Sequence, residues 1–136
     1  MMNETILDVK NLNIRFIRKD GSFFSAVYNS NFYVNEGEVL AIVGESGSGK
    51  SVTALSLMGL IDAKKVLYKS TNSIVFEDKE LTSLSENEWQ TIRGDKIGMI
   101  FQEPMSSLNP LLKVGEQIAE VAEAEAVEEA TEEAAE

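Results

Sequence analysis

A glycine-rich segment between an apolar run and a helical pattern constrains this chain more than any other feature. Its eight residues, Gly44-Glu45-Ser46-Gly47-Ser48-Gly49-Lys50-Ser51, fit the pattern G-x-x-x-x-G-K-[ST] at every fixed position. The preceding run, Val39–Val43, is wholly apolar and predicts a short strand buried on both faces. The following stretch, Ser51–Ile61, carries apolar side chains at helical spacing. The sequence therefore predicts a strand–loop–helix unit that binds phosphate.

The residue types of this loop suit a polyphosphate ligand. Its glycines let the backbone approach phosphate oxygens closely, and consecutive N–H groups then point inward as donors. A helix that begins near Gly49 adds unpaired N–H groups and the positive end of its dipole. Lys50 can reach the β- and γ-phosphates, and the Ser51 hydroxyl can ligate Mg²⁺. The alternative interpretation is a Gly/Ser-rich turn followed by a surface lysine.

Patterns elsewhere predict the elements around this loop. Alternation over residues 6–16 predicts one or two half-buried strand pieces with a break at Asn11–Leu12, and Phe24–Val34 predicts a second strand. Asp20-Gly21 and Asn35-Glu36-Gly37-Glu38 are turn signals. We also expect a strand at Ile74–Phe76 with a turn at residues 77–80, and then a helix from its N-cap Ser85 to about Ile92. Arg93-Gly94-Asp95 breaks that helix. After it we expect a strand at Ile97–Phe101, a loop at Pro104–Pro110 and a helix from about Val114. This order predicts an α/β or α+β fold with antiparallel first strands and later strands in a crossover sheet.

Composition excludes several functional classes. The chain has no histidine and no cysteine, which excludes a Ser-His-Asp triad, a Cys-His pair, a Cys/His zinc site and any disulfide. Its longest nearly apolar runs, Val39–Val43 and Ala54–Ile61, are too short to span a bilayer, and residues 1–10 lack a signal-peptide pattern. No basic block indicates binding to nucleic acid or to an anionic membrane surface.

The acidity of the chain is concentrated in residues 119–136. These residues hold eight Glu, seven Ala, two Val, one Thr and no Lys or Arg, and without them the net charge of −11 falls to −3. Alanine favours a helix, whereas glutamates at i,i+4 repel one another. We therefore expect a solvated, frayed helix or a disordered tail here. Its two-letter composition also suggests a non-native terminus.

Four sequence blocks together resemble one protein family. They are Asn35–Glu38, the loop Gly44–Ser51, Met99–Pro110 and Val114–Ile118. They resemble the ATPase subunits of ABC transporters and, within these, the oligopeptide/dipeptide (and nickel) importers. The resemblance covers about residues 5–118. It implies an α/β phosphate-loop NTPase fold, a RecA-like ABC ATPase core with an N-terminal antiparallel β portion, in residues 1–118, followed by the acidic tail 119–136.

The resemblance also implies roles for single residues, with ATP and Mg²⁺ as ligands. Gln102 matches the Q-loop glutamine, which contacts Mg²⁺ or the attacking water, and an amide can offer an oxygen to a metal. Phe16 occupies the position of an aromatic side chain that stacks on adenine, with Phe24 and Tyr28 as rivals. The implied nucleotide-binding residues are Phe16, Gly44, Glu45, Ser46, Gly47, Ser48, Gly49, Lys50, Ser51 and Val52. Lys50 and Gln102 are the implied catalytic residues, and Ser51 and Gln102 the implied metal ligands.

The family pattern is incomplete in this sequence. Ile74-Val75-Phe76-Glu77-Asp78 could pass for a Walker B strand, but it precedes Gln102 and its acidic order is reversed, so we predict a strand that ends in a turn. Three further features of the family do not occur in this sequence. They are a signature of the Leu-Ser-Gly-Gly-Gln type, a Walker B aspartate with its catalytic glutamate, and a switch histidine. We therefore expect a chain that binds ATP without turning it over.

The alternative is a fragment or engineered scaffold with an idle loop. No Asn-Lys-x-Asp motif supports a GTPase, and no candidate lid supports a kinase.

The resemblance implies partners and a location. These are the transporter's membrane subunits and a second ATPase subunit, at the cytoplasmic face of the membrane, with no nucleic acid. If strands of the core sheet are missing, unpaired edges would favour self-association.

Overall fold

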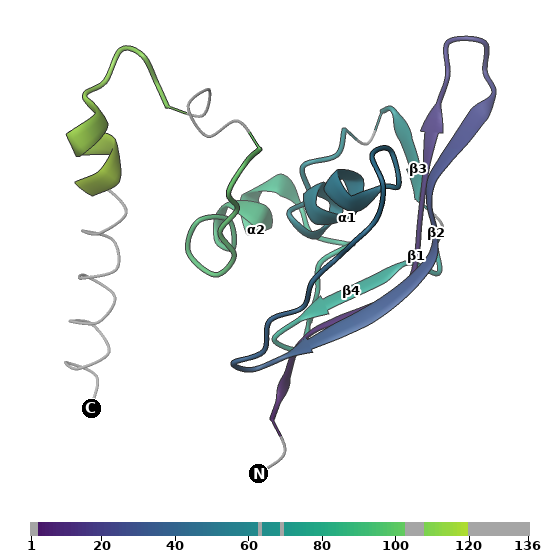
Figure 1. The fold of residues 1–136 in the computed structure, drawn as a ribbon, viewed down its shortest axis with the longest axis horizontal. Coiled ribbons are helices and arrows are strands. Elements are labelled where there is room, and N and C mark those ends of the chain that lie inside the picture. Colours follow the sequence, from purple (N-terminus) through teal and green to yellow (C-terminus); the bar gives the residue numbers. More distant parts are fainter. Residues whose placement is uncertain (1–2, 63, 69, 103–107, 120–136) are drawn as a thin grey trace. The chain divides into compact units, whose positions relative to one another are not determined.

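The structure, a computed structural model, describes residues 3–62, 64–68, 70–102 and 108–119 (Figure 1). The chain divides into two compact units, Met1–Thr91 and Ile92–Glu136. In the described residues, no helix combines the length and the apolar character that a membrane span requires.

The first unit is built on an antiparallel sheet in which β1 is central. Its strand order is β2-β1-β4-β5, and β3 pairs with β1 beyond the end of β4. The strands are β1 (Thr5–Ile17), β2 (Phe23–Asn35), β3 (Val66–Tyr68), β4 (Ser73–Phe76) and β5 (Lys79–Glu80). The predicted antiparallel pairing of the first two strands is confirmed, whereas β3 was not predicted.

The hairpin of β1 and β2 follows from its turn and from a bulge. Gly21 takes φ +82°, and the Asp20 carboxylate accepts hydrogen bonds from the Ser22 N–H and hydroxyl, which hold the Asp20 pKa below its usual value. The predicted break at Asn11–Leu12 is confirmed as a bulge, with Asn11 at φ +54° and a register shift between Val9 and Leu12.

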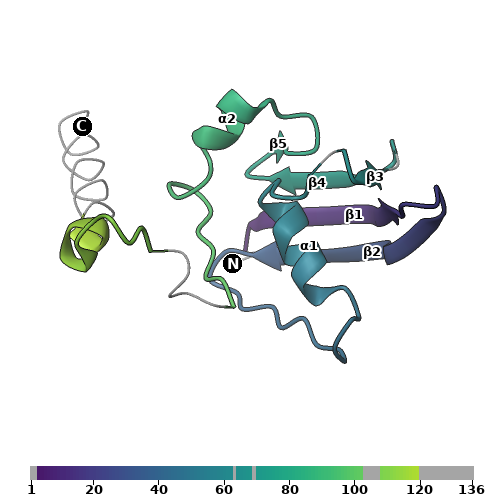
Figure 2. The same ribbon diagram turned by 90° about the horizontal axis from the view of Figure 1, so that it is seen from above.

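Two short helices accompany the sheet. The helix α1 (Lys50–Leu57) lies across one face of it, as Figure 2 shows. It ends earlier than the predicted Ile61 because Gly59 adopts φ +60° and the Leu60 N–H bonds back to the Leu55 carbonyl. The helix α2 (Glu86–Gln90) starts at the predicted N-cap, Ser85, in a capping box with Glu88. Apolar side chains fill the space between, and the most deeply buried are Val9, Leu12, Ile14 and Leu81.

Two predicted strands are wrong. Val39–Val43 and Ile97–Phe101 are not strands, apart from an isolated bridge between Arg93 and Ile97. Val39 is 95% exposed and Ile100 is 90% exposed, so neither segment is buried as its pattern indicated. A strand buried on both faces needs hydrogen-bonded neighbours. In the described residues, every ladder belongs to β1–β5 and none reaches these segments.

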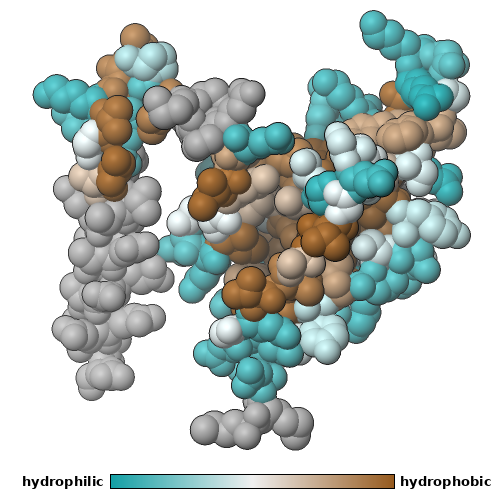
Figure 3. Space-filling model, in the orientation of Figure 1, coloured by the Kyte–Doolittle hydropathy of each residue, from teal (hydrophilic) through white to brown (hydrophobic). Residues whose placement is uncertain are grey.

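Because Val39–Val43 is not a buried strand, its apolar side chains add to the surface of the first unit. Figure 3 shows apolar side chains gathered on one face of it. The exposed apolar residues of this unit include Val39, Leu40, Ile42 and Val43.

The second unit contains less regular structure in its described part. Residues 114–119 are helical, which confirms the predicted helix start at Val114. The Gln117 side chain ties this helix to the preceding loop, accepting from the Asn109 N–H at 2.8 Å and donating to the Asn109 carbonyl at 3.1 Å. Residues 104–107 of the predicted loop and residues 120–136 of the predicted tail lie outside the described residues.

Candidate functional site

The glycine-rich loop leads into α1 with the backbone that its sequence requires. Gly47 and Gly49 adopt φ +81° and +94°, in the left-handed region where side chains are strained. Gly49 is the N-cap of α1, and no side chain from the described residues caps this helix end. The N–H groups of the first helical turn therefore stay available to an external acceptor.

The Lys50 amine is folded back onto its own loop. Its Nζ donates to the carbonyl oxygens of Gly44 at 2.5 Å and Glu45 at 2.9 Å, and it lies 3.4 Å from the Ser48 hydroxyl. Two of these partners are neutral carbonyls, which a phosphate oxygen would replace with a stronger, charge-assisted partner. The lysine is thus held at the mouth of the loop, where an anionic ligand would meet it.

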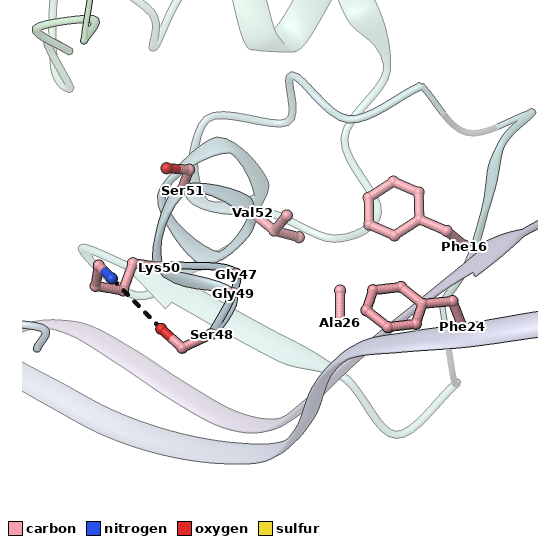
Figure 4. A pocket seen from close by; sticks show the side chains of 9 residues that line it. All are labelled: Phe16, Phe24, Ala26, Gly47, Ser48, Gly49, Lys50, Ser51 and Val52. Carbon is pink, nitrogen blue, oxygen red and sulfur yellow. Dashed lines mark hydrogen bonds between the residues drawn. The ribbon is translucent and has the colours of Figure 1, made fainter. Parts of the chain in front are cut away.

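A cavity of about 280 Å³ connects this loop to the sheet. In Figure 4 the rings of Phe16 and Phe24 lie at one end of it and Lys50 at the other, with Ala26 and Val52 between them. The residues that line it are Phe16, Phe24, Ala26, Gly47, Ser48, Gly49, Lys50, Ser51 and Val52. An aromatic end and a cationic, N–H-rich end in one cavity suit a ligand with a flat ring at one end and phosphates at the other.

Of the predicted nucleotide-binding residues, seven line this cavity. Gly44, Glu45 and Ser46 do not, and the first two instead supply the carbonyls that hold Lys50. Among the rival aromatic residues, Tyr28 is 75% exposed and lies outside the lining, whereas Phe24 belongs to it. The alternation of side chains along β2 puts Phe24 and Ala26 on one face of the sheet. The sequence shows this alternation but does not show which face borders the cavity.

The two predicted metal ligands belong to different units of the chain. The exposed Ser51 hydroxyl is at the first turn of α1, beside Lys50. Gln102 is exposed and belongs to the second unit, so its contact with Mg²⁺ stays a prediction. Within the described ranges, no cluster of three or more acidic side chains could hold a metal by itself. The chemistry of this donor set fits a Mg²⁺ ion that receives one hydroxyl from the protein and its other ligands from phosphate and water.

Glu77 and Asp78 form a turn after β4, as predicted, whereas Lys79 and Glu80, which the prediction placed in that turn, form β5. Glu77 and Asp78 have φ +44° and +63° and connect β4 to β5, so they do not end a parallel strand beside the loop. The nearby Glu80 carboxylate has a structural role. Burial opposes its ionisation, but hydrogen bonds outweigh burial and hold its pKa below the usual value for glutamate. The donors are the Ile74 N–H, the Ser73 hydroxyl, and the N–H and hydroxyl of Thr82.

A family model and several known proteins are similar to this chain. The family described as "ABC transporter" matches residues 27–136. The oligopeptide transport ATP-binding protein AppD of Bacillus subtilis is 51% identical over 119 residues, which are 86% of this chain and 35% of AppD. OppD of the same organism is 53% identical over 116 residues, covering 85% of this chain and 32% of OppD. The dipeptide transport ATP-binding protein DppD of Lactococcus lactis is 48% identical over 120 residues, 88% of this chain and 34% of DppD. The chain therefore spans about a third of the length of these relatives.

Proposed function

This chain belongs to the ABC transporter family, and from that premise we propose that its first unit binds ATP with Mg²⁺ through the loop Gly44–Ser51. The observation that carries this proposal is the shared cavity, in which one end is aromatic and the other is cationic. The adenine ring would stack at Phe16, and the triphosphate would extend toward Lys50 and the first turn of α1.

Each loop residue contributes a distinct interaction. The Lys50 amine exchanges the carbonyls of Gly44 and Glu45 for the β- and γ-phosphate oxygens. The uncapped N–H groups at the start of α1 donate to the same phosphates. When bound, Mg²⁺ neutralises part of the phosphate charge, and Ser51 is the residue that would hold it. These contacts position the triphosphate and stabilise its charge, which is most of what phosphoryl transfer needs.

We propose that the 136-residue chain binds ATP without rapid hydrolysis. The side chain that we assign to the attacking water is Gln102, and an amide can orient water but cannot take its proton. The sequence contains no histidine, and no acidic side chain lines the cavity in the part of the chain that the structure describes, so neither kind of base is placed to take the proton. Phosphate release from the chain with Mg²⁺-ATP, compared with the Lys50→Ala variant, tests this. Turnover that Lys50→Ala abolishes would contradict the proposal.

The names of the relatives support a role in peptide uptake. Several relatives are oligopeptide or dipeptide transport ATP-binding proteins. We propose that this chain is the ATP-binding part of an ATPase subunit that energises peptide import at the cytoplasmic face of a membrane, with membrane subunits and a second ATPase subunit as partners. Binding of the chain to purified membrane subunits of a peptide importer in detergent tests the partnership, with subunits of an unrelated importer as the control.

Calorimetric titration with Mg²⁺-ATP tests nucleotide binding. Lys50→Ala removes the amine beside the proposed phosphates and is expected to weaken binding by at least about tenfold, the value of one charge-assisted hydrogen bond. Lys64→Ala is the matched control, because it removes the same charge from an exposed residue outside the cavity lining. Equal ATP affinity for wild type and both variants would contradict the proposal. A wild-type chain that folds but binds no ATP would favour the idle scaffold.

A further inference from the structure

Phe24 is a large apolar side chain that the fold leaves 46% exposed. It lies directly opposite Phe16 in the register of β1 and β2, so the two rings stand beside each other on one face of the sheet. Both rings line the cavity at the end away from Lys50 (Figure 4). The exposed aromatic surface in this cavity is therefore a pair of rings, and Phe16 supplies only one of them.

Arg18 restrains the second ring. Its guanidinium carbon lies 5.5 Å from the centroid of the Phe24 ring, within the range of a cation–π interaction. The backbone of Arg18 is itself fixed by the turn, because its N–H donates to the Ser22 carbonyl at 2.8 Å and its carbonyl accepts from the Gly21 N–H at 3.0 Å. The turn between β1 and β2 thus fixes the backbone from which the Arg18 side chain reaches Phe24, and the guanidinium beside the ring favours one orientation of Phe24.

The aromatic end of the cavity has few means of recognition other than stacking. Phe16, Phe24, Ala26 and Val52 line it there, and none of these side chains carries a hydrogen-bonding group. A flat ring can gain affinity at such a surface through its π-face, whichever groups it carries at its edges. The site therefore suits a purine base held by stacking on the paired rings.

We propose that Phe24 forms a two-ring stacking surface with Phe16 for the nucleotide base, and that Arg18 is a positioning residue that orients Phe24. This inference rests on the proposed nucleotide-binding function. It differs from the family resemblance, which implied a single stacking aromatic at this position. In this inference the Arg18 guanidinium interacts with the Phe24 ring and does not contact the triphosphate.

The test compares a ligand that has a base with one that lacks it. Mg²⁺-ATP and magnesium tripolyphosphate are titrated calorimetrically into the full chain and its Phe24→Leu variant. We expect Phe24→Leu to weaken ATP binding at least about fivefold, the lower range for base–aromatic stacking, and to leave tripolyphosphate affinity unchanged. Phe24→Trp retains a ring and is expected to restore ATP affinity. Phe23→Leu is the matched control, because Phe23 is the adjacent residue of β2, is 53% exposed and does not line the cavity.

A double-variant cycle tests the role of Arg18. Arg18→Gln alone is expected to weaken ATP binding about two- to fivefold. In the Phe24→Leu background it should have no further effect, because it acts through that ring. A loss of tripolyphosphate affinity in Arg18→Gln would show that the guanidinium contacts phosphate, and would overturn this part of the inference.

The outcomes separate this inference from the function on which it rests. If Lys50→Ala weakens both ligands but Phe24→Leu behaves like Phe23→Leu, the loop binds nucleotide and the two-ring surface is wrong. If the folded wild-type chain binds neither ligand, the proposed function is wrong and the inference is overturned with it. If Phe24→Leu weakens ATP binding while Phe23→Leu and Phe24→Trp bind ATP like wild type, the proposed function and the two-ring surface are both supported.

Discussion

A β-carbon on Gly49 would lie 2.5 Å from the backbone carbonyl oxygen of Ala26, so the phosphate loop is packed directly against β2. The third glycine of the loop therefore serves the fold as well as the ligand. This contact sets the loop at the same face of the sheet as Phe16 and Phe24. It makes the cavity a consequence of close packing between α1 and the hairpin of β1 and β2.

Gly49→Ala is expected to lower the free energy of unfolding by about 2–4 kcal/mol, because it adds a clash with backbone to the strain of a side chain at positive φ. Gly47→Ala is the matched control, since its φ is also positive but nothing lies within 4 Å of the added carbon. It should cost only about 1–2 kcal/mol. Urea unfolding monitored through Trp89, the single tryptophan, measures both. Equal losses would show that the contact with Ala26 relaxes freely.

Gly59→Ala should disturb the packing of Trp89. The added carbon would lie 2.4 Å from the indole ring, which is buried, and Gly59 has φ +60°. We expect a loss of about 2–4 kcal/mol of stability and a red-shifted tryptophan emission as the ring moves toward water. Gly37→Ala has a similar φ of +69° with open space around it, and should leave the emission unchanged. An unshifted emission in Gly59→Ala would contradict this prediction.

Asn72 is expected to be more costly to remove than Asn31. Its side chain accepts from the Asn13 N–H at 3.0 Å and donates to the Asn13 carbonyl at 2.8 Å, and both residues are buried. Asn72→Ala would leave these two backbone groups unpaired, at about 2–4 kcal/mol. Asn31 makes a similar bond to the Asn11 N–H but is exposed, so water can replace it and Asn31→Ala should cost under about 1 kcal/mol. Urea unfolding of the two variants distinguishes the sites, and similar losses would argue against burial as the cause.

The ionised Glu80 side chain is expected to make the free energy of unfolding depend on pH. Its pKa is lowered in the folded state by its hydrogen bonds, so its contribution is present at neutral pH and is lost as the pH falls through that lowered value. Glu80→Gln should therefore be less stable than wild type at pH 7, and the difference should narrow toward pH 3. Glu36→Gln, at an exposed turn residue, is the control. A difference that is constant from pH 7 to pH 3 would show that ionisation of Glu80 does not stabilise the fold.

Local sequence determined the parts of this protein that depend on near neighbours. The motif of Gly44–Ser51 predicted a loop followed by a helix, and the structure has that arrangement, with left-handed Gly47 and Gly49 in the loop and Lys50 as the first residue of α1. Asp20-Gly21 predicted the hairpin turn, and Ser85 predicted the start of α2 as its N-cap, to which the structure adds a capping box with Glu88. In each case the groups that satisfy the backbone are only a few residues apart, so the pattern carries the whole physical cause.

Tertiary structure decided the rest, because the remaining features depend on partners distant in sequence. Val39–Val43 has the pattern of a buried strand, but a strand forms only when another strand pairs with it, and none of the described strands does so. Phe24 was one of several aromatic candidates until the register of β1 and β2 placed it opposite Phe16 and Tyr28 outside the cavity. Hydrophobic periodicity reports which face of a segment avoids water. It does not report which segment will cover that face, and here the packing of α1 and β2 determined the shape of the site.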